Sequence, residues 1–167
     1  MPVSRPSARA GVRTLAEPMR VYRIGDPRGA YPIYSGEGAA RIEGRWHEKG
    51  QEVIYTSRHY STALLEKLAH FNGVLPSNQH YIEIEILKGV SYEIVTKDSL
   101  PGWLEMAKAR ALGSSWYREK RSAILIVPSF VARIEENIII NCGHPDAARI
   151  RPGLEHPVAW DMRLFQP

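Results

Sequence analysis

The chain has 167 residues, a size at which one domain buries roughly two thirds of its unfolded surface without disulfides or metals. Its single cysteine, Cys142, excludes an internal disulfide and any multi-cysteine zinc site. The formal charge of +4 permits contact with anionic ligands but selects no class of ligand, because part of the excess lies near the N-terminus. No run approaches the roughly 18 apolar residues of a transmembrane helix, so we expect a cytoplasmic protein without membrane contact.

The N-terminal residues 1–19 contain prolines, small residues and scattered arginines without sustained periodicity, and this composition predicts a flexible arm. Residues 20–167 are then expected to form one domain. Its first strand is predicted at 20–24, where alternation places Val21 and Arg23 on one face. Residues 26–40 are rich in glycine and turn formers and predict a loop over a cleft.

The segment from Gly44 to His70 combines a strand, a turn and a helix. Residues 53–55 form a short β-rich run typical of a buried strand, and Ser57 is a candidate N-cap for the helix that follows. Apolar residues recur at helical spacing from Tyr60 onward. Glu66 lies beside this apolar stripe on a polar flank, where its carboxylate can face a cleft.

The second half of the chain contains several short β-rich runs separated by helical segments. A helix is predicted near 103–112, ending at Gly113, with a brief helix or turn around 116–119. Strands are predicted at 80–86, 91–95, 122–127 and 137–140, of which the last two form an antiparallel pair. Because helices and strands do not alternate regularly, we expect an α+β domain of mostly antiparallel sheets flanked by helices.

Several motifs in this order resemble the RES family, the toxin component of bacterial toxin–antitoxin pairs, named for characteristic Arg, Glu and Ser residues. We match these three to Arg45 in GRW, Glu66 in ALLEKLAH and Ser129 in IVPS. The resemblance runs from about Tyr22 to the terminal WDMRL. It departs from the family pattern after Asn141, where a cysteine stands in place of the expected proline.

The resemblance implies a fold similar to that of ADP-ribosyltransferases, with NAD as substrate in a cleft between two sheets and without a metal. Arginine forks can hold a pyrophosphate in a bidentate manner, and aromatic rings can stack on nicotinamide. The candidate NAD-binding residues are therefore Arg23, Arg45, Trp46 and Tyr55. The candidate catalytic residues are Arg45, Tyr55, Glu66 and Ser129.

Cleavage of the nicotinamide–ribose bond generates positive charge on the ribose, which a nearby carboxylate stabilises. Glu66 is the candidate for this role, and Ser129 would position Glu66 or the nicotinamide end by hydrogen bonding. Water, inorganic phosphate or a macromolecular group as acceptor would make the enzyme a glycohydrolase, a phosphorylase or an ADP-ribosyltransferase, respectively. The resemblance favours depletion of free NAD over modification of one target.

The resemblance also implies partners, namely an Xre-like helix-turn-helix antitoxin, which alone would contact DNA, and a homodimer of the toxin within the complex. A cleft that carries Arg23 and Arg45 would accept an acidic segment of the antitoxin. A hypothesis of a different class is a non-catalytic nucleic-acid-binding module that uses the basic tail and an arginine-lined groove. The aromatic residues, however, do not interleave with a dense basic stripe.

Overall fold

The structure is a computed structural model that describes residues 11–167. Within this range a nine-stranded sheet has the order β1-β5-β6-β7-β3-β2-β4-β8, with β9 also pairing with β4. Among the described strands, only β5 and β6 pair in parallel. The strands are β1 (Arg13–Thr14), β2 (Met19–Gly25), β3 (Val53–Ser57), β4 (His80–Ile86), β5 (Ser91–Ile94), β6 (Ile124–Pro128), β7 (Glu136–Asn141), β8 (Ile150–Pro152) and β9 (His156–Pro157).

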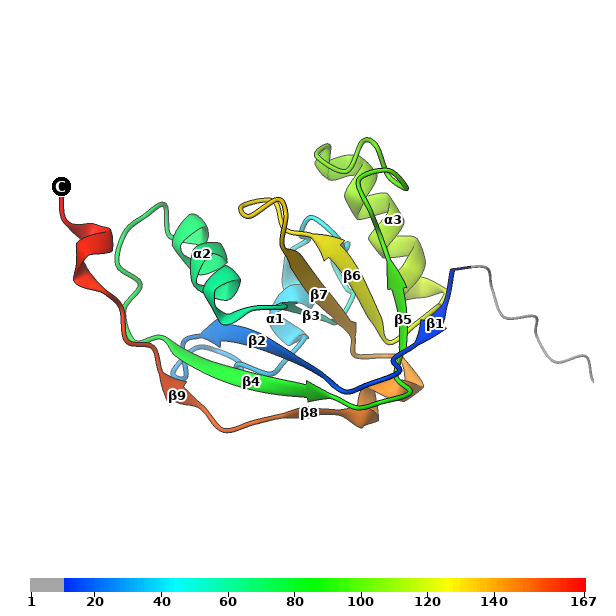
Figure 1. Ribbon diagram of the computed structural model, residues 1–167, viewed down its shortest axis with the longest axis horizontal. Helices are drawn as coiled ribbons and strands as arrows, with labels where there is room; N and C mark the ends of the chain where they lie inside the picture. The colour runs from blue at the N-terminus through cyan, green and yellow to red at the C-terminus, as the bar shows by residue number, and fades with distance from the viewer. Residues whose placement is uncertain (1–10) are drawn as a thin grey trace, which may run out of the picture.

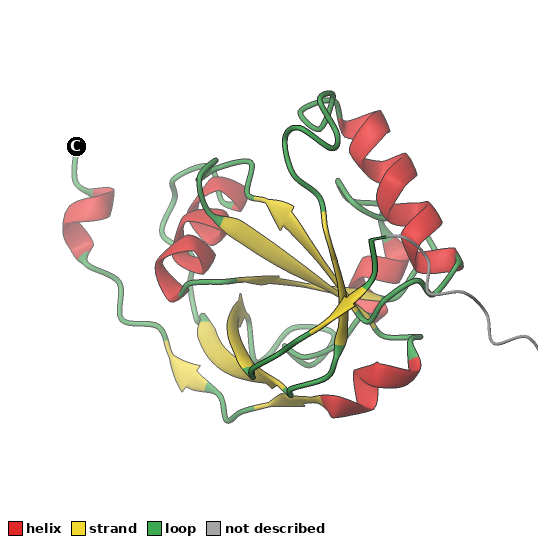
Figure 2. Ribbon diagram, turned by 45° about the vertical axis from the view of Figure 1, so that its right-hand side comes forward, coloured by secondary structure: helices red, strands yellow, loops and turns green. Residues whose placement is uncertain are grey.

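Helices flank this sheet (Figures 1 and 2), which confirms the α+β class and the mostly antiparallel pairing predicted from the sequence. The helices are α1 (Glu37–Arg41), α2 (Tyr60–His70) and α3 (Met106–Arg118), with 3-10 turns η1 (Pro145–Arg149) and η2 (Met162–Phe165). Along residues 11–167, none of the helices has the length and apolar character needed to cross a membrane.

The sheet divides into two halves between β2 and β3. Strand β2 pairs with β4 at all of its residues, from Met19 to Gly25. It pairs with β3 only where Tyr22 lies opposite Ser57. The strands of the two halves therefore fan apart (Figure 2), and α2 lies close to both, since it contacts β2 and β3. This divergence leaves room for a cleft next to α2.

Both faces of the central strands are buried, which explains why β6 and β7 read as continuous apolar runs rather than alternating ones. In β7, Ile138 and Ile140 pack into one apolar cluster, while Ile139 packs into a second cluster on the opposite face. Trp103 and Trp116 belong to the second cluster, which also includes residues of α3. The β-branched residues of these strands thus anchor the sheet on two sides.

The predicted interruption of the third helix at Gly113 is wrong, because α3 runs without a break from Met106 to Arg118. A Cβ atom at Gly113 would lie 1.9 Å from the carbonyl oxygen of Trp46. The glycine therefore permits close approach of α3 to the backbone of the segment before β3, and it is not a helix stop.

Two other local expectations differ from the structure. Helix α2 has His59 at its N-cap position, without a side-chain capping bond, while Ser57 is the last residue of β3. Residues 26–40 are not wholly loop, since α1 begins at Glu37. In addition, Ile33 in this stretch is buried in the core. The segment therefore packs on the sheet as part of the domain.

The expected extension of a flexible arm to residue 19 does not agree with the structure of residues 13–15. Strand β1 pairs with β5, with Arg13 opposite Tyr92, and Leu15 is buried in the main apolar cluster. These contacts make residues 13–15 part of the folded domain. The part of the predicted arm that precedes residue 11 lies outside the described residues.

Candidate functional site

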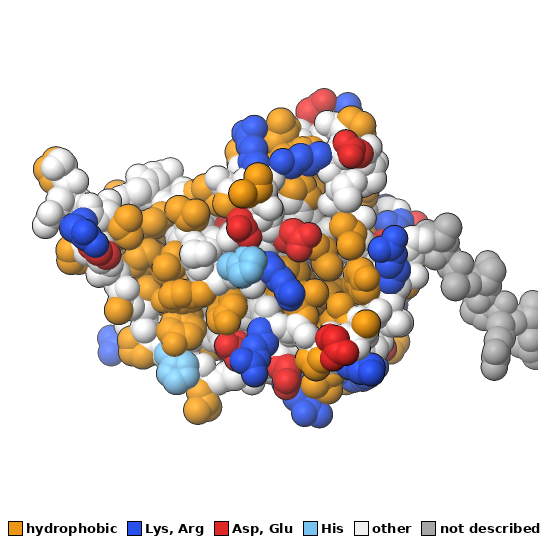
Figure 3. Space-filling view, viewed as in Figure 1, with side chains coloured by type: hydrophobic (Ala, Val, Ile, Leu, Met, Phe, Trp, Pro, Cys, Tyr) orange, Lys and Arg blue, Asp and Glu red, His pale blue; other side chains and the backbone are white. Residues whose placement is uncertain are grey.

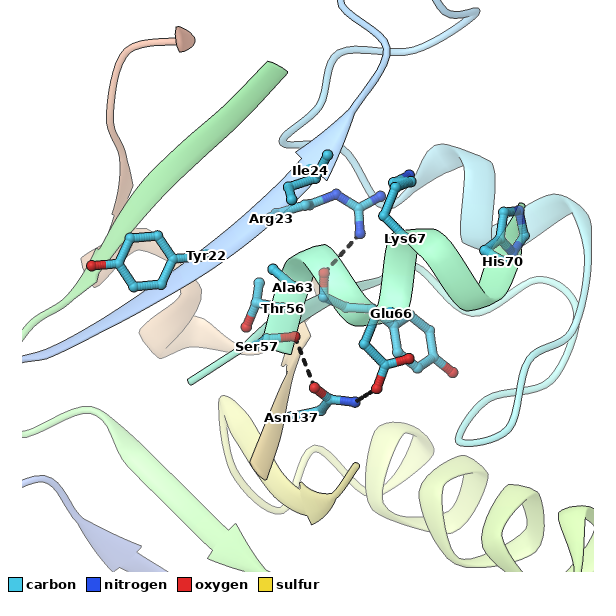
Figure 4. Close-up of a pocket in the computed structure, with 11 residues that line it drawn as sticks. Tyr22, Arg23, Ile24, Thr56, Ser57, Ala63, Glu66, Lys67, His70 and Asn137 are labelled. Atoms are coloured by element: carbon cyan, nitrogen blue, oxygen red, sulfur yellow. Dashed lines mark hydrogen bonds between the residues drawn. The ribbon is translucent and has the colours of Figure 1, made fainter. Parts of the chain in front are cut away.

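A cleft of about 380 Å³ lies where the two halves of the sheet diverge (Figure 4). Strands β2, β3 and β7 and one side of helix α2 form its walls. The residues that line it are Tyr22, Arg23, Ile24, Tyr55, Thr56, Ser57, Ala63, Glu66, Lys67, His70 and Asn137. Of the residues predicted to form the site, Arg23, Tyr55 and Glu66 are thus brought together in one cavity.

Helix α2 turns a partly polar side toward this cleft. Ala63, Glu66, Lys67 and His70 follow the spacing of one helical face, and all four line the cavity. On the same helix, Leu65 is 45% exposed. The apolar stripe therefore does not by itself determine which side of α2 faces inward. The inward side of the helix contacts the cleft as well as the core.

The carboxylate of Glu66 is held by two donors from different strands. The hydroxyl of Ser129 donates to Oε1 at 2.8 Å, and the side-chain amide of Asn137 donates to the same oxygen at 2.6 Å. Ser129 is completely buried and does not line the cleft. Ser129 therefore contacts Glu66 without reaching the cavity itself, and its predicted positioning role stays a prediction.

Arg23 is embedded at the split between the two sheet halves. Its Nε donates to the carbonyl of Ile33 at 2.6 Å, and Nη1 donates to the carbonyl of Tyr55 at 2.8 Å. Burial lowers the pKa of this guanidinium. No carboxylate among the described residues forms an ion pair with it. Its charge is therefore available to an anion that enters the cleft.

Lys67 adds a second positive charge to the same cavity. Burial lowers the pKa of its ammonium group, and the neighbouring Arg23 lowers it further, against a smaller opposing effect of Asp26. Two desolvated cations close together are unfavourable unless an anion compensates them. The region around Arg23 and Lys67 therefore has the electrostatic character of an anion site.

Tyr55 contributes its ring to the cleft, while its hydroxyl is bonded elsewhere. The phenolic oxygen lies 2.7 Å from Nδ1 of His47 and accepts a hydrogen bond from the backbone N–H of Trp46 at 3.1 Å. Burial raises the pKa of Tyr55 to about 12. The phenol therefore stays protonated and engaged, and the aromatic ring is what a ligand can meet.

Arg45 lies next to the site without lining the cleft. Its guanidinium carbon is 4.1 Å from the centre of the Phe130 ring, and Nη1 donates to the carbonyl of Leu104 at 3.2 Å. Burial lowers the pKa of Arg45, and the charge of Glu66 acts in the opposite direction. Arg45 is thus within electrostatic reach of Glu66, at a distance beyond a direct ion pair.

Trp46 is not available as a platform for a ligand, which corrects the expectation for this residue. It is only 3% exposed and packs in the apolar cluster that includes residues of α3. Its backbone N–H binds the Tyr55 hydroxyl. Trp46 therefore contacts Tyr55 from the apolar cluster and does not line the cleft.

The polar residues of the site that sequence reasoning missed include Ser57, Lys67 and Asn137. Ser57 was expected to cap α2, but its hydroxyl donates to Oδ1 of Asn137 at 2.8 Å. Asn137 was expected only as the start of a strand. No spacing signal links these positions, because they meet through strand pairing and not through sequence proximity. Lys67 could have been found by placing it beside Glu66 on the inward face of the helix.

Comparisons with known proteins give a consistent picture. The family model for the RES domain matches residues 20–161. A Prs ADP-ribosylating toxin of Sphingobium sp. (strain YBL2) is 37% identical over 139 residues, covering 79% of this chain and 86% of that protein. Toxin Res of Pseudomonas putida (strain KT2440) is 31% identical over 140 residues, covering 81% and 95%, respectively.

A solved structure has the same fold at much lower sequence identity. The crystal structure of the M. tuberculosis MbcT–MbcA toxin–antitoxin complex contains a chain that superimposes with a TM-score of 0.68 at 14% identity, covering 87% of this chain and 86% of that one. This likeness concerns the fold alone. The family match over residues 20–161 and the two toxins that are 37% and 31% identical show that the chain belongs to the RES domain family.

Proposed function

We propose that the protein is the toxin of a toxin–antitoxin pair and that it cleaves the nicotinamide–ribose bond of NAD. The observation that carries this proposal is the pairing, in one cleft, of a fixed carboxylate, Glu66, with two cations, Arg23 and Lys67, that form no ion pair among the described residues. A pyrophosphate suits the cations and a ribose that develops positive charge suits the carboxylate. The names of the curated relatives, which are called toxins, support the same conclusion.

In this mechanism the pyrophosphate of NAD binds near Arg23 and Lys67, with Arg45 at the adjoining rim. The ring of Tyr55 forms a wall against the nicotinamide end. The bond between C1′ of the ribose and the nicotinamide nitrogen breaks, and its electron pair stays on nicotinamide, which leaves as a neutral molecule without a general acid. Glu66 stabilises the oxocarbenium-like ribose until an acceptor oxygen or nitrogen attacks C1′.

We propose water or inorganic phosphate as the acceptor, so that the reaction depletes free NAD. Transfer of ADP-ribose to a macromolecule is a second candidate. The observation that favours it is the name of the Sphingobium relative, Prs ADP-ribosylating toxin. The two classes of product differ. Free ADP-ribose or its 1″-phosphate indicates depletion, whereas label that stays on a protein indicates transfer.

An antitoxin would restrain this activity. The neighbouring fold was solved as part of a toxin–antitoxin complex, which supports a partner of this class. We propose an Xre-like helix-turn-helix protein with an acidic segment that competes with NAD near Arg23 and Arg45, and a homodimer of the toxin within the complex. Co-purification followed by an NAD assay tests occlusion, and a stable complex with full turnover would contradict it.

The alternative of a nucleic-acid-binding module has less support. On the face shown in Figure 3, Lys and Arg side chains of the described residues are interspersed with Asp and Glu, so they form no continuous basic stripe there. A phosphate-tracking groove needs clustered positive charge. Steeply salt-dependent binding of nucleic acid without NAD turnover would favour the module.

The deciding experiment measures NAD consumption by purified, antitoxin-free protein, with and without phosphate and with products identified by mass. The Glu66→Gln variant keeps the size of the side chain and removes its charge, so we expect turnover to fall on the order of 100- to 1000-fold. Glu17→Gln, an exposed position outside the cleft, is the matched control. Near-normal turnover of folded Glu66→Gln would eliminate Glu66 as the stabilising group.

A further inference from the structure

We propose that Asn137, oriented by Ser57, is a positioning residue that fixes the Glu66 carboxylate for catalysis. This inference rests on the NAD-cleaving function proposed above and deepens it. It assigns a role to two side chains outside the Arg, Glu and Ser signature of the family. It also explains why one oxygen of Glu66 is left for the substrate.

The orientation of the Asn137 amide follows from the chemistry of its neighbours. An ionised carboxylate can only accept hydrogen bonds, so the group that faces Oε1 of Glu66 at 2.6 Å must be the amide NH₂. The amide oxygen then points the other way and accepts from the hydroxyl of Ser57 at 2.8 Å (Figure 4). The carboxylate thus sets the amide orientation, and the Ser57 hydroxyl, which can donate or accept, holds the amide in that orientation by donating to Oδ1.

Strand pairing holds this chain of hydrogen bonds rigidly. Ser57 and Asn137 lie directly opposite each other in the antiparallel pair β3 and β7. Ser129 follows the last residue of β6, which is also antiparallel to β7. The ends of β3 and β6 and the start of β7 therefore meet at the same edge of the sheet, where α2 brings Glu66. The donors are fixed by the backbone before any ligand binds.

The two donors to Glu66 share one acceptor atom. Ser129 and Asn137 both bind Oε1, and within residues 11–167 no side chain or backbone group binds Oε2. With Oε1 held, rotation of the carboxylate about its last torsion is blocked, and Oε2 is free for the ribose. A preorganised charge of this kind stabilises a transition state without reorganisation at the moment of reaction.

The test is a double-mutant cycle on kcat and KM for NAD. In Asn137→Ala, Glu66 loses one of its two donors, and we expect kcat to fall about 100-fold with little change in KM, since a displaced catalytic group costs rates of that order. In Ser57→Ala, the amide loses its orienting bond, and we expect kcat to fall about 3- to 10-fold. Adding Ser57→Ala to Asn137→Ala should have no further effect, because Ser57 acts only through Asn137.

Ser61→Ala, on the exposed side of α2, is the control for the serine substitution. Thermal unfolding of every variant separates loss of the fold from loss of positioning. Asn137→Asp is a second, isosteric variant that replaces the amide donor by an acceptor. Additive effects of Ser57→Ala and Asn137→Ala, or a rise in KM without a fall in kcat, would overturn the positioning role. Normal kcat in folded Asn137→Asp would do the same.

A measurement without turnover separates this inference from the proposed function. In the NMR spectrum of the wild-type protein, the hydrogen bond to the carboxylate should displace the chemical shift of one side-chain amide proton of Asn137. The substitution Glu66→Gln or Ser57→Ala should change this chemical shift. If the wild type shows this signal but cleaves no NAD, the proposed function fails and the hydrogen-bond chain stands as structure only, which overturns its catalytic role. If NAD is cleaved and the signal does not respond to either variant, the positioning inference alone fails.

Discussion

The imidazole of His47 and the phenol of Tyr55 form a hydrogen bond of 2.7 Å that determines what Tyr55 can do in the site. The other ring nitrogen of His47 lies 2.8 Å and 3.0 Å from the carbonyl oxygens of Ala39 and Ile42. Because carbonyls accept only, this nitrogen carries the proton, and Nδ1 accepts from the Tyr55 hydroxyl. The hydroxyl is thus committed to His47 and cannot serve as an acid for the substrate.

The Tyr55→Phe variant should therefore keep its turnover rate within about threefold of the wild type, while losing about 1 kcal/mol of stability with the hydrogen bond. Tyr55→Ala removes the ring that lines the cleft and should raise KM clearly. Steady-state kinetics and thermal unfolding of both variants check this. If folded Tyr55→Phe turns over NAD about 100-fold more slowly than the wild type, the hydroxyl takes part in catalysis after all.

Lys67 should make the affinity for NAD depend on pH in the alkaline range. Its folded pKa is lowered from the ordinary 10.5, so the charge that attracts the pyrophosphate is lost as pH rises through that lowered value. At pH values between the lowered pKa and 10.5, Lys67 binds more protons in the unfolded chain than in the folded protein. Its contribution to folding stability therefore rises with pH in this range, while its contribution to NAD binding falls. In Lys67→Arg the charge persists, and KM should stay level over the same range.

The measurement is KM for NAD from neutral pH to about pH 10 in both proteins, at constant ionic strength. Lys88→Arg, a change at an exposed lysine outside the cleft, serves as the control. An equal alkaline rise of KM in the wild type and in Lys67→Arg would exclude Lys67 as its cause.

Arg45 lies over the Phe130 ring, so Arg45→Lys keeps the charge but loses the planar group that stacks there. We expect KM to rise by roughly tenfold, with a smaller change in kcat, if Arg45 binds the ground state and the transition state equally. Unchanged KM would place Arg45 outside the substrate site. A selective fall in kcat would instead show that its charge acts on the reacting groups.

Gly113 provides a test of the packing between α3 and the segment that carries Arg45 and Trp46. In an ordinary helix, glycine to alanine stabilises by up to about 1 kcal/mol. Here the new Cβ would meet the Trp46 carbonyl at 1.9 Å, so Gly113→Ala should destabilise by roughly 1–3 kcal/mol. Chemical denaturation measures the difference, with Ala111→Gly at an exposed position of α3 as the control. A gain in stability would show that α3 can move away without cost.

The sequence by itself determined the features that depend on local patterns. The strict alternation at 80–86 and the apolar run in β6 predicted strands because side-chain periodicity and burial are properties of each segment alone. The resemblance to the RES family pointed to Glu66 and to Ser129, which the structure joins by a hydrogen bond of 2.8 Å. The catalytic roles of Arg45, Tyr55, Glu66 and Ser129 stay predictions for the experiments above.

Only the tertiary structure decided how segments far apart in the chain meet. Gly113 looked like a helix stop, since the sequence does not show that the backbone of Trp46 passes within contact distance of α3. Ser57 looked like a helix cap, and Asn137 looked only like the start of a strand. The two side chains meet because β3 and β7 pair in one register, and that register is fixed by contacts along whole strands rather than by the residues that it brings together.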